Sequence, residues 1–172
     1  MKNLSEMTDE ELALAYADGN NKAFDLLLSR NQSKLFSYIL FVVRDREKAE
    51  DVFQETFVKV ISKLQQGRYA TTGKFGAWLV RIAHNVIMDS YRERRSEKVV
   101  EPADNNDLSN LGNDELLDTN IECKYVNDQV MRDVKKIMNL LPTPQREVVY
   151  MRYYQQLSFK EIAECTNVSI NT

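Results

Sequence analysis

Apolar residues recur every three to four positions along most of the chain, and no window shows sustained alternation of apolar and polar residues. The first spacing is typical of amphipathic helices, and the alternation that is missing is typical of strands. The pattern predicts helices over residues 9–18, 21–43, 47–65, 75–95, 126–140, 144–154 and 158–165, and Asn31 marks a candidate break in the second. We therefore expect an all-α fold.

Residues that cap helices support these boundaries. Thr8 and Ser158 are each followed three residues later by a glutamate, which is the spacing of a capping box. Asp45 stands before the helix predicted over residues 47–65 and can accept a bond from its first free amides. Gly19 follows the first predicted helix as a stop signal.

The last residues, 159–172, fit a helix-turn-helix. Asn167 occupies the position of the turn over 166–168 that needs a positive φ, which Asn tolerates, and Ser169 is placed to cap a second helix. The sequence ends at Thr172, after about one turn of that helix, whereas a recognition helix reaches several base edges. We therefore expect a domain truncated in its recognition helix; a plain helical hairpin is the alternative.

Composition agrees with long helices and limits the location of the protein. Gly and Pro are scarce, at 5 and 3 of 172 residues, and the hydrophobic share of 43% is enough for a core. The longest apolar run, over residues 39–43, is far shorter than the roughly 20 residues that span a bilayer. With two widely spaced cysteines and no apolar leader, we expect a cytoplasmic protein without membrane insertion and with reduced thiols.

Charge is unevenly distributed although the net charge is only −3. Residues 99–123 hold seven acidic and no basic residues, whereas residues 74–98 hold six basic and three acidic ones. We expect two small helical domains, over residues 1–96 and 125–172, joined by an acidic flexible linker over 97–124. On composition alone the acidic segment could equally be a solvated loop without a role.

The sequence lacks the usual signatures of catalysis. It contains one histidine, no Cys-x-x-Cys pair and no glycine-rich phosphate loop. Glu47, Asp51 and Glu55 share one helix face, but the Glu-x-x-His pairs that complete di-metal carboxylate sites are missing. We expect no metal, no cofactor and no enzymatic activity; a helical enzyme remains the weakest alternative.

Two polar surfaces are candidates for binding. Asp51, Gln54 and Glu55 lie opposite the apolar stripe of the helix over 47–65, and a merely solvated acidic face is the alternative. The outer face of the helix over 75–95 and the loop before it carry Arg, Lys, Asn and Tyr side chains. Such groups suit an unpaired DNA strand, because they bind phosphates and stack on bases.

Four segments together resemble the extracytoplasmic-function (ECF) branch of the sigma-70 family, the promoter-recognition subunits of bacterial RNA polymerase. They are residues 49–57 (AEDVFQETF), 75–85 (FGAWLVRIAHN), 141–154 (LPTPQREVVYMRYY) and 157–164 (LSFKEIAE). They occur in the family's order, and their co-occurrence is more specific than any one of them.

The resemblance implies roles for particular residues. Asp51, Gln54 and Glu55 would dock on core RNA polymerase. The minus-ten element of promoter DNA would be bound by Arg68, Tyr69, Thr71, Thr72, Lys74, Trp78, Arg81, His84, Asn85, Arg92 and Arg95. Contacts to the minus-thirty-five element would be partial, through Ser169, Asn171 and Thr172. An anti-sigma factor is a further partner implied by the family, and we expect a monomer.

The main alternative is a helix-turn-helix transcription regulator with a helical sensing or dimerisation module. Such a protein would form a dimer and bind DNA without polymerase.

Overall fold

In a computed structural model of the chain, residues 3–69, 74–97, 133 and 136–171 are described, and they form helices and turns with no strand among them. The all-α prediction is therefore confirmed. The helices are η1 (Leu4–Glu6), α1 (Asp9–Ala17), α2 (Asn21–Val43), α3 (Arg46–Gln65), α4 (Phe75–Glu97), α6 (Thr143–Tyr153) and α7 (Phe159–Thr166). Residues 136–140 are also helical. Residues 98–124 of the expected linker, and most of the helix predicted over 126–140, lie outside the described residues.

Three predicted helix caps are confirmed. At the start of α1, the Thr8 hydroxyl accepts from the Glu11 amide at 3.2 Å and the Glu11 carboxylate accepts from the Thr8 amide at 2.9 Å. Ser158 and Glu161 form the same reciprocal box at the start of α7. Asp45 accepts from the Lys48 amide at the start of α3. Each cap satisfies an amide that has no partner inside its helix.

The candidate break at Asn31 is wrong, because α2 runs without interruption from Asn21 to Val43. The Asn31 side-chain amide donates to the Leu27 carbonyl at 2.9 Å and to the Asp9 carboxylate at 2.8 Å. The side chain therefore shares the Leu27 carbonyl, which has two lone pairs, with the backbone of its own helix and also reaches across to α1, so the helix continues through this position.

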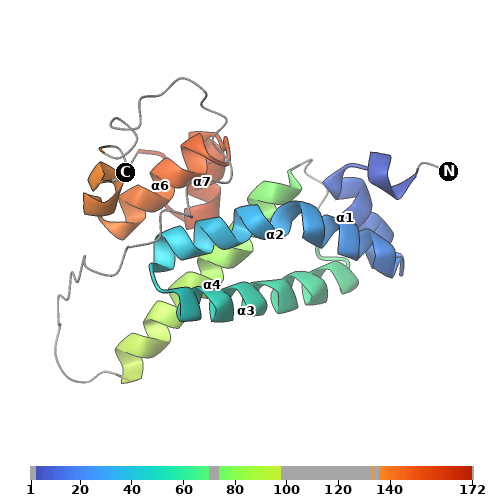
Figure 1. Ribbon diagram of the computed structural model, residues 1–172, viewed down its shortest axis with the longest axis horizontal. Helices are drawn as coiled ribbons and strands as arrows, with labels where there is room; N and C mark the ends of the chain where they lie inside the picture. The colour runs from blue at the N-terminus through green and yellow to red at the C-terminus, as the bar shows by residue number, and fades with distance from the viewer. Residues whose placement is uncertain (1–2, 70–73, 98–132, 134–135, 172) are drawn as a thin grey trace.

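Helices α1 to α4 form the first module. Helix α2 packs against α1, α3 and α4, and α3 packs against α4, so that α2 and α3 run side by side (Figure 1). The apolar stripes read from the sequence face inward. The largest fully buried side chains of this module are Leu12, Leu27, Leu35, Tyr38, Ile39, Val42, Val60, Leu64, Phe75, Val86 and Ile87. Burying an aliphatic side chain of this size stabilises a fold by about 1.5–3 kcal/mol.

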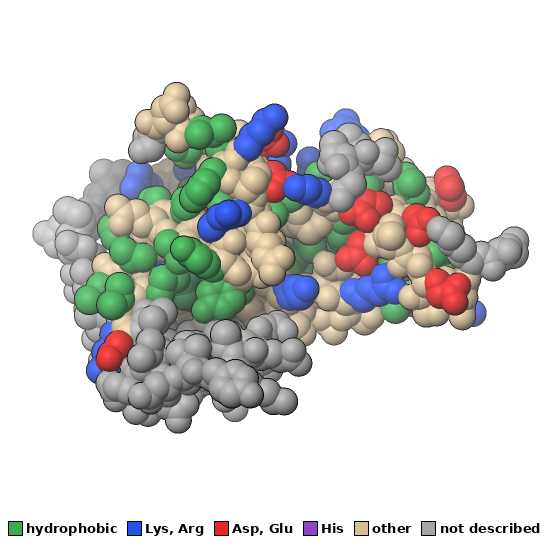
Figure 2. All heavy atoms as spheres, turned by 90° about the horizontal axis from the view of Figure 1, so that it is seen from above, with side chains coloured by type: hydrophobic (Ala, Val, Ile, Leu, Met, Phe, Trp, Pro, Cys, Tyr) green, Lys and Arg blue, Asp and Glu red, His purple; other side chains and the backbone are tan. Residues whose placement is uncertain are grey.

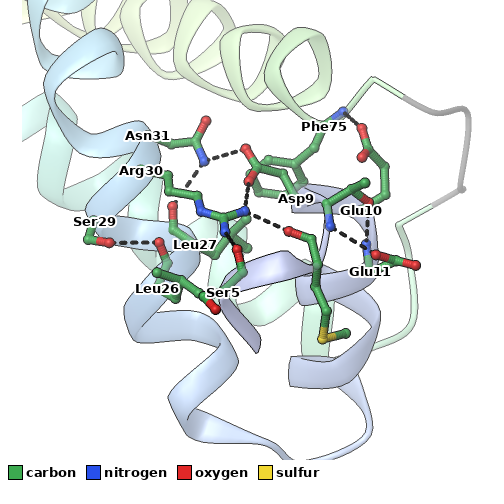
Figure 3. Close-up of polar contacts among 12 residues, drawn as sticks. Ser5, Asp9, Glu10, Glu11, Leu26, Leu27, Ser29, Arg30, Asn31 and Phe75 are labelled. Atoms are coloured by element: carbon green, nitrogen blue, oxygen red, sulfur yellow. Dashed lines mark hydrogen bonds and ion pairs between the residues drawn. The ribbon is translucent and has the colours of Figure 1, made fainter. Parts of the chain in front are cut away.

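A polar cluster ties the N-terminal segment to α2 (Figure 3). The Arg30 guanidinium donates to the backbone carbonyls of Ser5 and Met7 at 2.8 and 2.7 Å, and pairs with Asp9 at 3.2 Å. One side chain thus fixes both η1 and the first turn of α1 against α2.

Helix α1 also holds the start of α4. The Glu10 carboxylate accepts from the Phe75 backbone amide at 3.0 Å, so it supplies the cap that the local sequence before α4 lacks (Figure 3). An acid at a helix N-terminus is favoured by the free amides and by the helix dipole. The start of α4 is therefore held by a residue far away in the sequence.

The second module packs directly on the first. Helix α6 contacts α2 and α7, and α7 contacts α4, so both lie over the region where α2 ends (Figure 1). Its own buried side chains are Tyr150, Met151, Leu157, Ile162 and Cys165. The sequence predicted the module but gave no indication that it would pack on the first one.

We expect Glu10→Gln to lower the free energy of unfolding by about 0.5–1 kcal/mol at neutral pH, since it removes the charge at the start of α4. The Phe75 amide is the largest cause that lowers the pKa of Glu10. A lowered folded pKa means that the contribution is present above the unfolded pKa and is lost as the pH falls through the folded one. Urea unfolding of wild type and variant should therefore differ at neutral pH and converge in acid, once the pH lies below the folded pKa of Glu10. Glu6→Gln, at an exposed position, is the control, and an equal loss in both variants would contradict the cap.

Candidate polymerase and nucleic-acid interfaces

The outer face of α3 carries the acidic patch predicted from the sequence. Asp51, Gln54 and Glu55 are exposed, and the opposite face of the helix is buried in the core. The side chains of Asp51 and Gln54 form no hydrogen bond or ion pair with another described residue, whereas the Glu55 carboxylate pairs with the Lys59 ammonium group at 2.9 Å. Val58, 65% exposed, adds an apolar group beside the patch. The patch is free to meet a partner.

A groove lies between the second half of α3 and the middle of α4. It has a volume of about 470 Å³ and is lined by Val58, Lys59, Ser62, Lys63, Gln66, Arg68, Ile82 and Asn85. Two of the predicted minus-ten residues, Arg68 and Asn85, therefore meet in one hollow although they are far apart in the sequence. The lining contains three basic residues and no acidic one. Such a groove suits a nucleic-acid strand, since basic groups hold phosphates and an amide can bond to a base edge.

Lys59 has a double role in this groove. Its ammonium group lies 2.9 Å from Glu55 and 3.7 Å from Asp89 on α4, so it links the two helices. The hydrogen bond to Glu55 raises the pKa of Lys59, which keeps the side chain charged. Lys63 has no such ion pair among the described residues and is the freer cation of the two.

The basic face of α4 continues beyond the groove. Arg81, Asn85, Arg92 and Arg95 are exposed, and Arg92 also pairs with Asp89 at 3.6 Å. Residues 81, 85 and 92 follow helical spacing along one side of α4. The structure thus brings these predicted residues to one surface and leaves them accessible.

Other predicted minus-ten residues lie differently. Tyr69 is buried and packs edge-on against Phe75 and Trp78, with ring centroids 5.7 and 5.0 Å away. Burial raises the pKa of Tyr69 to about 12. The three rings form an aromatic cluster in which Tyr69 and Phe75 are buried and Trp78 is partly buried. Thr71 and Thr72 lie outside the described residues, and Lys74 forms an ion pair with Glu161 of α7.

His84 is buried rather than exposed. Its Nδ1 atom lies 2.5 Å from the Glu147 carboxylate of α6, and only 7% of the residue is exposed. In this arrangement the second module covers the face of α4 that His84 occupies. The contact of His84 with DNA stays a prediction, and it requires an arrangement in which the second module does not cover this face of α4.

The turn predicted at the C-terminus is present. Asn167 ends α7 with φ 55°, the left-handed conformation expected from the sequence. Ser169 and Asn171 are exposed, and the Ser169 hydroxyl accepts from the Asn171 amide at 3.3 Å. After Ser169, where the second helix was expected to begin, residues 170 and 171 form a turn, and Thr172 lies outside the described residues.

Exposed apolar side chains gather on the second module. Figure 2, which looks onto α6 and α7, shows them as separate green patches with Lys and Arg between them. The exposed set consists of Ile137, Leu140, Tyr153, Phe159, Val168 and Ile170. An exposed cluster of this kind is typical of a surface that another protein covers.

The described residues contain no group of three or more His, Cys, Asp or Glu side chains that could hold a metal ion. No helix among them is both long enough and apolar enough to cross a bilayer.

Comparison with known proteins decides the family. The family described as Sigma-70 region 2 matches residues 27–97, and the family described as Sigma-70, region 4 matches residues 131–172. The RNA polymerase sigma-H factor of Pseudomonas aeruginosa is 28% identical over 171 residues, which cover 98% of this chain and 88% of the relative. The ECF RNA polymerase sigma-E factor of Haemophilus influenzae is 28% identical over 172 residues, covering 97% and 88%. The chain belongs to the ECF branch of the sigma-70 family.

A solved structure supports the same fold for this sigma factor. The structure of CnrH in complex with the cytosolic domain of CnrY aligns with a TM-score of 0.60 and 24% sequence identity, covering 95% of this chain and 85% of that one. At this identity the likeness concerns the fold. The two matched regions coincide with the two modules, apart from the first 26 residues, which include η1 and α1.

Sequence reasoning missed three residues of this sigma factor that the structure brings to its functional surfaces. Lys59 and Lys63 line the groove, and their spacing of four residues at the end of α3 was the signal that could have shown a shared basic face. Glu147 lies against His84 across the interface between the modules. Nothing in the local sequence around Glu147 indicates burial, because a glutamate in a helix is normally solvated.

Substitutions at Asn167 test whether its left-handed backbone conformation matters for stability. Asn167→Ala should lower the free energy of unfolding by about 1–2 kcal/mol, because a left-handed conformation is costly for an ordinary L-residue. Asn167→Gly should change it by less than about 0.5 kcal/mol, since Gly adopts positive φ freely. Chemical unfolding measures both, with Ser169→Ala as the control at an exposed neighbour. Equal effects of Ala and Gly would show that φ does not matter at this position.

Proposed function

We propose that this sigma factor brings core RNA polymerase to its promoters by docking through α3 and by holding the unpaired minus-ten strand in the groove between α3 and α4. The observation that carries the proposal is the groove itself, which places Arg68, Asn85 and two lysines around one hollow without an acidic residue. The acidic patch on the same helix supplies a second surface of opposite charge.

Helix α3 has a division of charge that fits two partners. Asp51 and Glu55 lie in its first half, and Lys59 and Lys63 in its second half. The acidic half suits a basic protein surface, and the basic half suits a polyanion. A net charge of −3 is compatible with DNA binding because the basic residues are grouped on one surface. The polymerase would also supply much of the affinity that depends on charge.

The docking surface predicts a loss of polymerase binding on charge reversal. In Asp51→Lys with Glu55→Lys, we expect the affinity for core polymerase to fall at least tenfold, since like charges would meet across the interface. The free energy of unfolding should change by about 0.5 kcal/mol or less, because both residues are exposed. Analytical ultracentrifugation with core polymerase and thermal unfolding measure the two quantities.

A matched control keeps the change in charge constant. Asp18→Lys with Asp25→Lys adds the same charge at exposed positions on other elements. Polymerase binding should persist in this control. Undiminished binding in the α3 double variant would refute docking through the acidic patch.

The groove predicts sequence-dependent binding of an unpaired strand. With core polymerase present, Asn85→Ala should reduce discrimination between a forked minus-ten template and a scrambled one, since a base contact is worth about 1–3 kcal/mol. Lys63→Ala should weaken binding of both templates alike and reduce its dependence on salt, because a phosphate contact carries no sequence information. Fluorescence anisotropy at several salt concentrations separates the two effects.

Exposed polar residues outside the groove are the controls for this experiment. Gln32→Ala and Lys34→Ala remove an amide and a cation from α2, and both should bind as wild type does. Equal discrimination by Asn85→Ala and wild type would place the base contact elsewhere.

The second module is proposed to contact the minus-thirty-five element through Ser169, Asn171 and Thr172. We further propose that its exposed apolar side chains bind a protein partner, with an anti-sigma factor as the candidate. Two observations support this: the exposure of Leu140 and Tyr153, at 74% and 75%, and the likeness to CnrH, solved in complex with the cytosolic domain of CnrY.

We also propose where this sigma factor is located and how it acts. A transcription initiation factor works with polymerase in the cytoplasm, as a monomer and without catalysis of its own. A helix-turn-helix regulator would instead bind duplex DNA as a dimer. Run-off transcription with and without core polymerase distinguishes them: product from a cognate promoter only when both proteins are present supports the sigma factor, and polymerase-independent duplex binding supports the alternative.

A further inference from the structure

The first turn of α4 is capped by a residue of α1. Helix α4 begins at Phe75, and the residue before it, Lys74, has no side-chain atom that can accept a hydrogen bond. The Phe75 amide donates instead to the Glu10 carboxylate at 3.0 Å. This bond is the largest cause that lowers the pKa of Glu10, so the carboxylate is charged at neutral pH. Glu10 therefore gives the start of α4 both an acceptor and a negative charge.

The turn of α1 that carries Glu10 is itself held firmly in place. The Asp9 carboxylate, next to Glu10, accepts from the Arg30 guanidinium at 3.2 Å and from the Asn31 side-chain amide at 2.8 Å (Figure 3). Both of these partners lie on α2, which packs against α1, α3 and α4. On the other side of the turn, Leu12 is fully buried in the core. The cap on α4 is therefore built on a fixed part of the first module.

The residue that receives the cap is also the centre of the aromatic cluster. The Phe75 ring is buried and lies 5.7 Å from the Tyr69 ring and 5.6 Å from the Trp78 ring, centroid to centroid. The Tyr69 hydroxyl is buried and has no hydrogen-bond partner among the described residues. The position of the Tyr69 ring thus depends on packing against Phe75 and Trp78. Fraying of the first turn of α4 would loosen all three rings together.

This cluster is connected to the groove between α3 and α4 on two sides. Arg68, which lines the groove, directly precedes Tyr69 in the chain. Asn85, which also lines the groove, follows Trp78 on α4 by seven residues, or about two helical turns, and so lies on the same side of the helix. A displacement of the cluster would therefore move groove residues through the backbone before Tyr69 and along α4.

We propose that Glu10 is a positioning residue for the minus-ten strand: its carboxylate holds the first turn of α4, and thereby the aromatic cluster that places Arg68 and Asn85 in the groove. The inference rests on the proposed function of the groove. It gives α1, which lies outside the matched family region, a part in strand recognition without contact with DNA. The later turns of α4 are packed in the core, so loss of the cap disturbs the start of the helix and leaves the rest folded.

Trp78 reports on the cluster without polymerase or DNA, because it is the only tryptophan of the chain. In Glu10→Ala, which removes both the acceptor and the charge, we expect the tryptophan emission to shift to longer wavelength. Quenching by acrylamide should increase about twofold, since a frayed first turn exposes the ring. Glu10→Gln keeps an oxygen that can accept from the Phe75 amide and should stay close to wild type. Glu6→Ala, at an exposed position on η1, is the matched control.

Strand recognition is the second measurement, made with core polymerase and fluorescence anisotropy. Discrimination is the ratio of the affinities for a forked minus-ten template and for a scrambled one. Glu10→Ala should lower this ratio about threefold to tenfold, because hydrogen bonds to base edges depend on the position of the donor. Its affinity for the scrambled template should stay within about twofold of wild type, since phosphate contacts tolerate small displacements.

Side chains of different length separate positioning from a general loss of stability. Glu10→Gln has the right length without the charge and should keep most of the discrimination, although it is expected to be less stable than wild type. Glu10→Asp keeps the charge but is one methylene too short to reach the Phe75 amide, and it should lose discrimination as Glu10→Ala does. If Glu10→Ala loses helical content in circular dichroism, Glu10→Asp decides in its place.

The outcome for Asn85→Ala distinguishes this inference from the proposed function. Wild-type discrimination in folded Glu10→Ala or Glu10→Asp, together with a loss in Asn85→Ala, would overturn the positioning role and leave the groove as the site of the strand. Wild-type discrimination in Asn85→Ala as well would count against both. An equal loss in Glu10→Gln and Glu10→Ala would also overturn the positioning role, because the hydrogen bond would then not matter.

Discussion

The Glu147 carboxylate lies in the interior with two hydrogen-bond donors, and neither of them comes from its own module. A buried carboxylate is stable only where such partners are held in place. This requirement fixes the position of α6 against α2 and α4, and with it the position of α7 over the start of α4. The polar contact is supported beside it by the ring of Tyr150 on α6, which packs against Tyr38 and Phe41 of α2 with centroids 5.7 and 5.0 Å away.

Helix α4 takes part in most of what the chain does. One side packs in the core of the first module, a second lines the basic groove with α3, and a third is covered by α6 and α7. Glu10 caps its start, so that α1, which lies outside the matched family region, positions the first turn of α4. The surfaces proposed for DNA and for polymerase and the contact between the modules are therefore adjacent.

Local chemistry made much of the fold predictable from sequence. Apolar spacing identified the helices of the described modules, the reciprocal pair Ser158 and Glu161 marked the start of α7, and Asn167 marked the turn that follows. The contact between the modules was not predictable, because it depends on His84 and Glu147, whose types are usually solvated and which lie 63 residues apart. The same limit applies to the candidate site: Arg68 and Asn85 were identified one by one, but the groove that joins them needs the packing of α3 on α4.

The role proposed for the groove between α3 and α4 is to hold the unpaired minus-ten strand. A photo-crosslinking amino acid in place of Gln66, which lines the groove, tests this directly in a complex of the chain with core polymerase and a forked template. We expect crosslinks to the unpaired minus-ten strand from this position and none from the same amino acid in place of Gln32, which is exposed on α2. A transcriptionally active complex without crosslinks from position 66 would contradict the groove as the site of the strand.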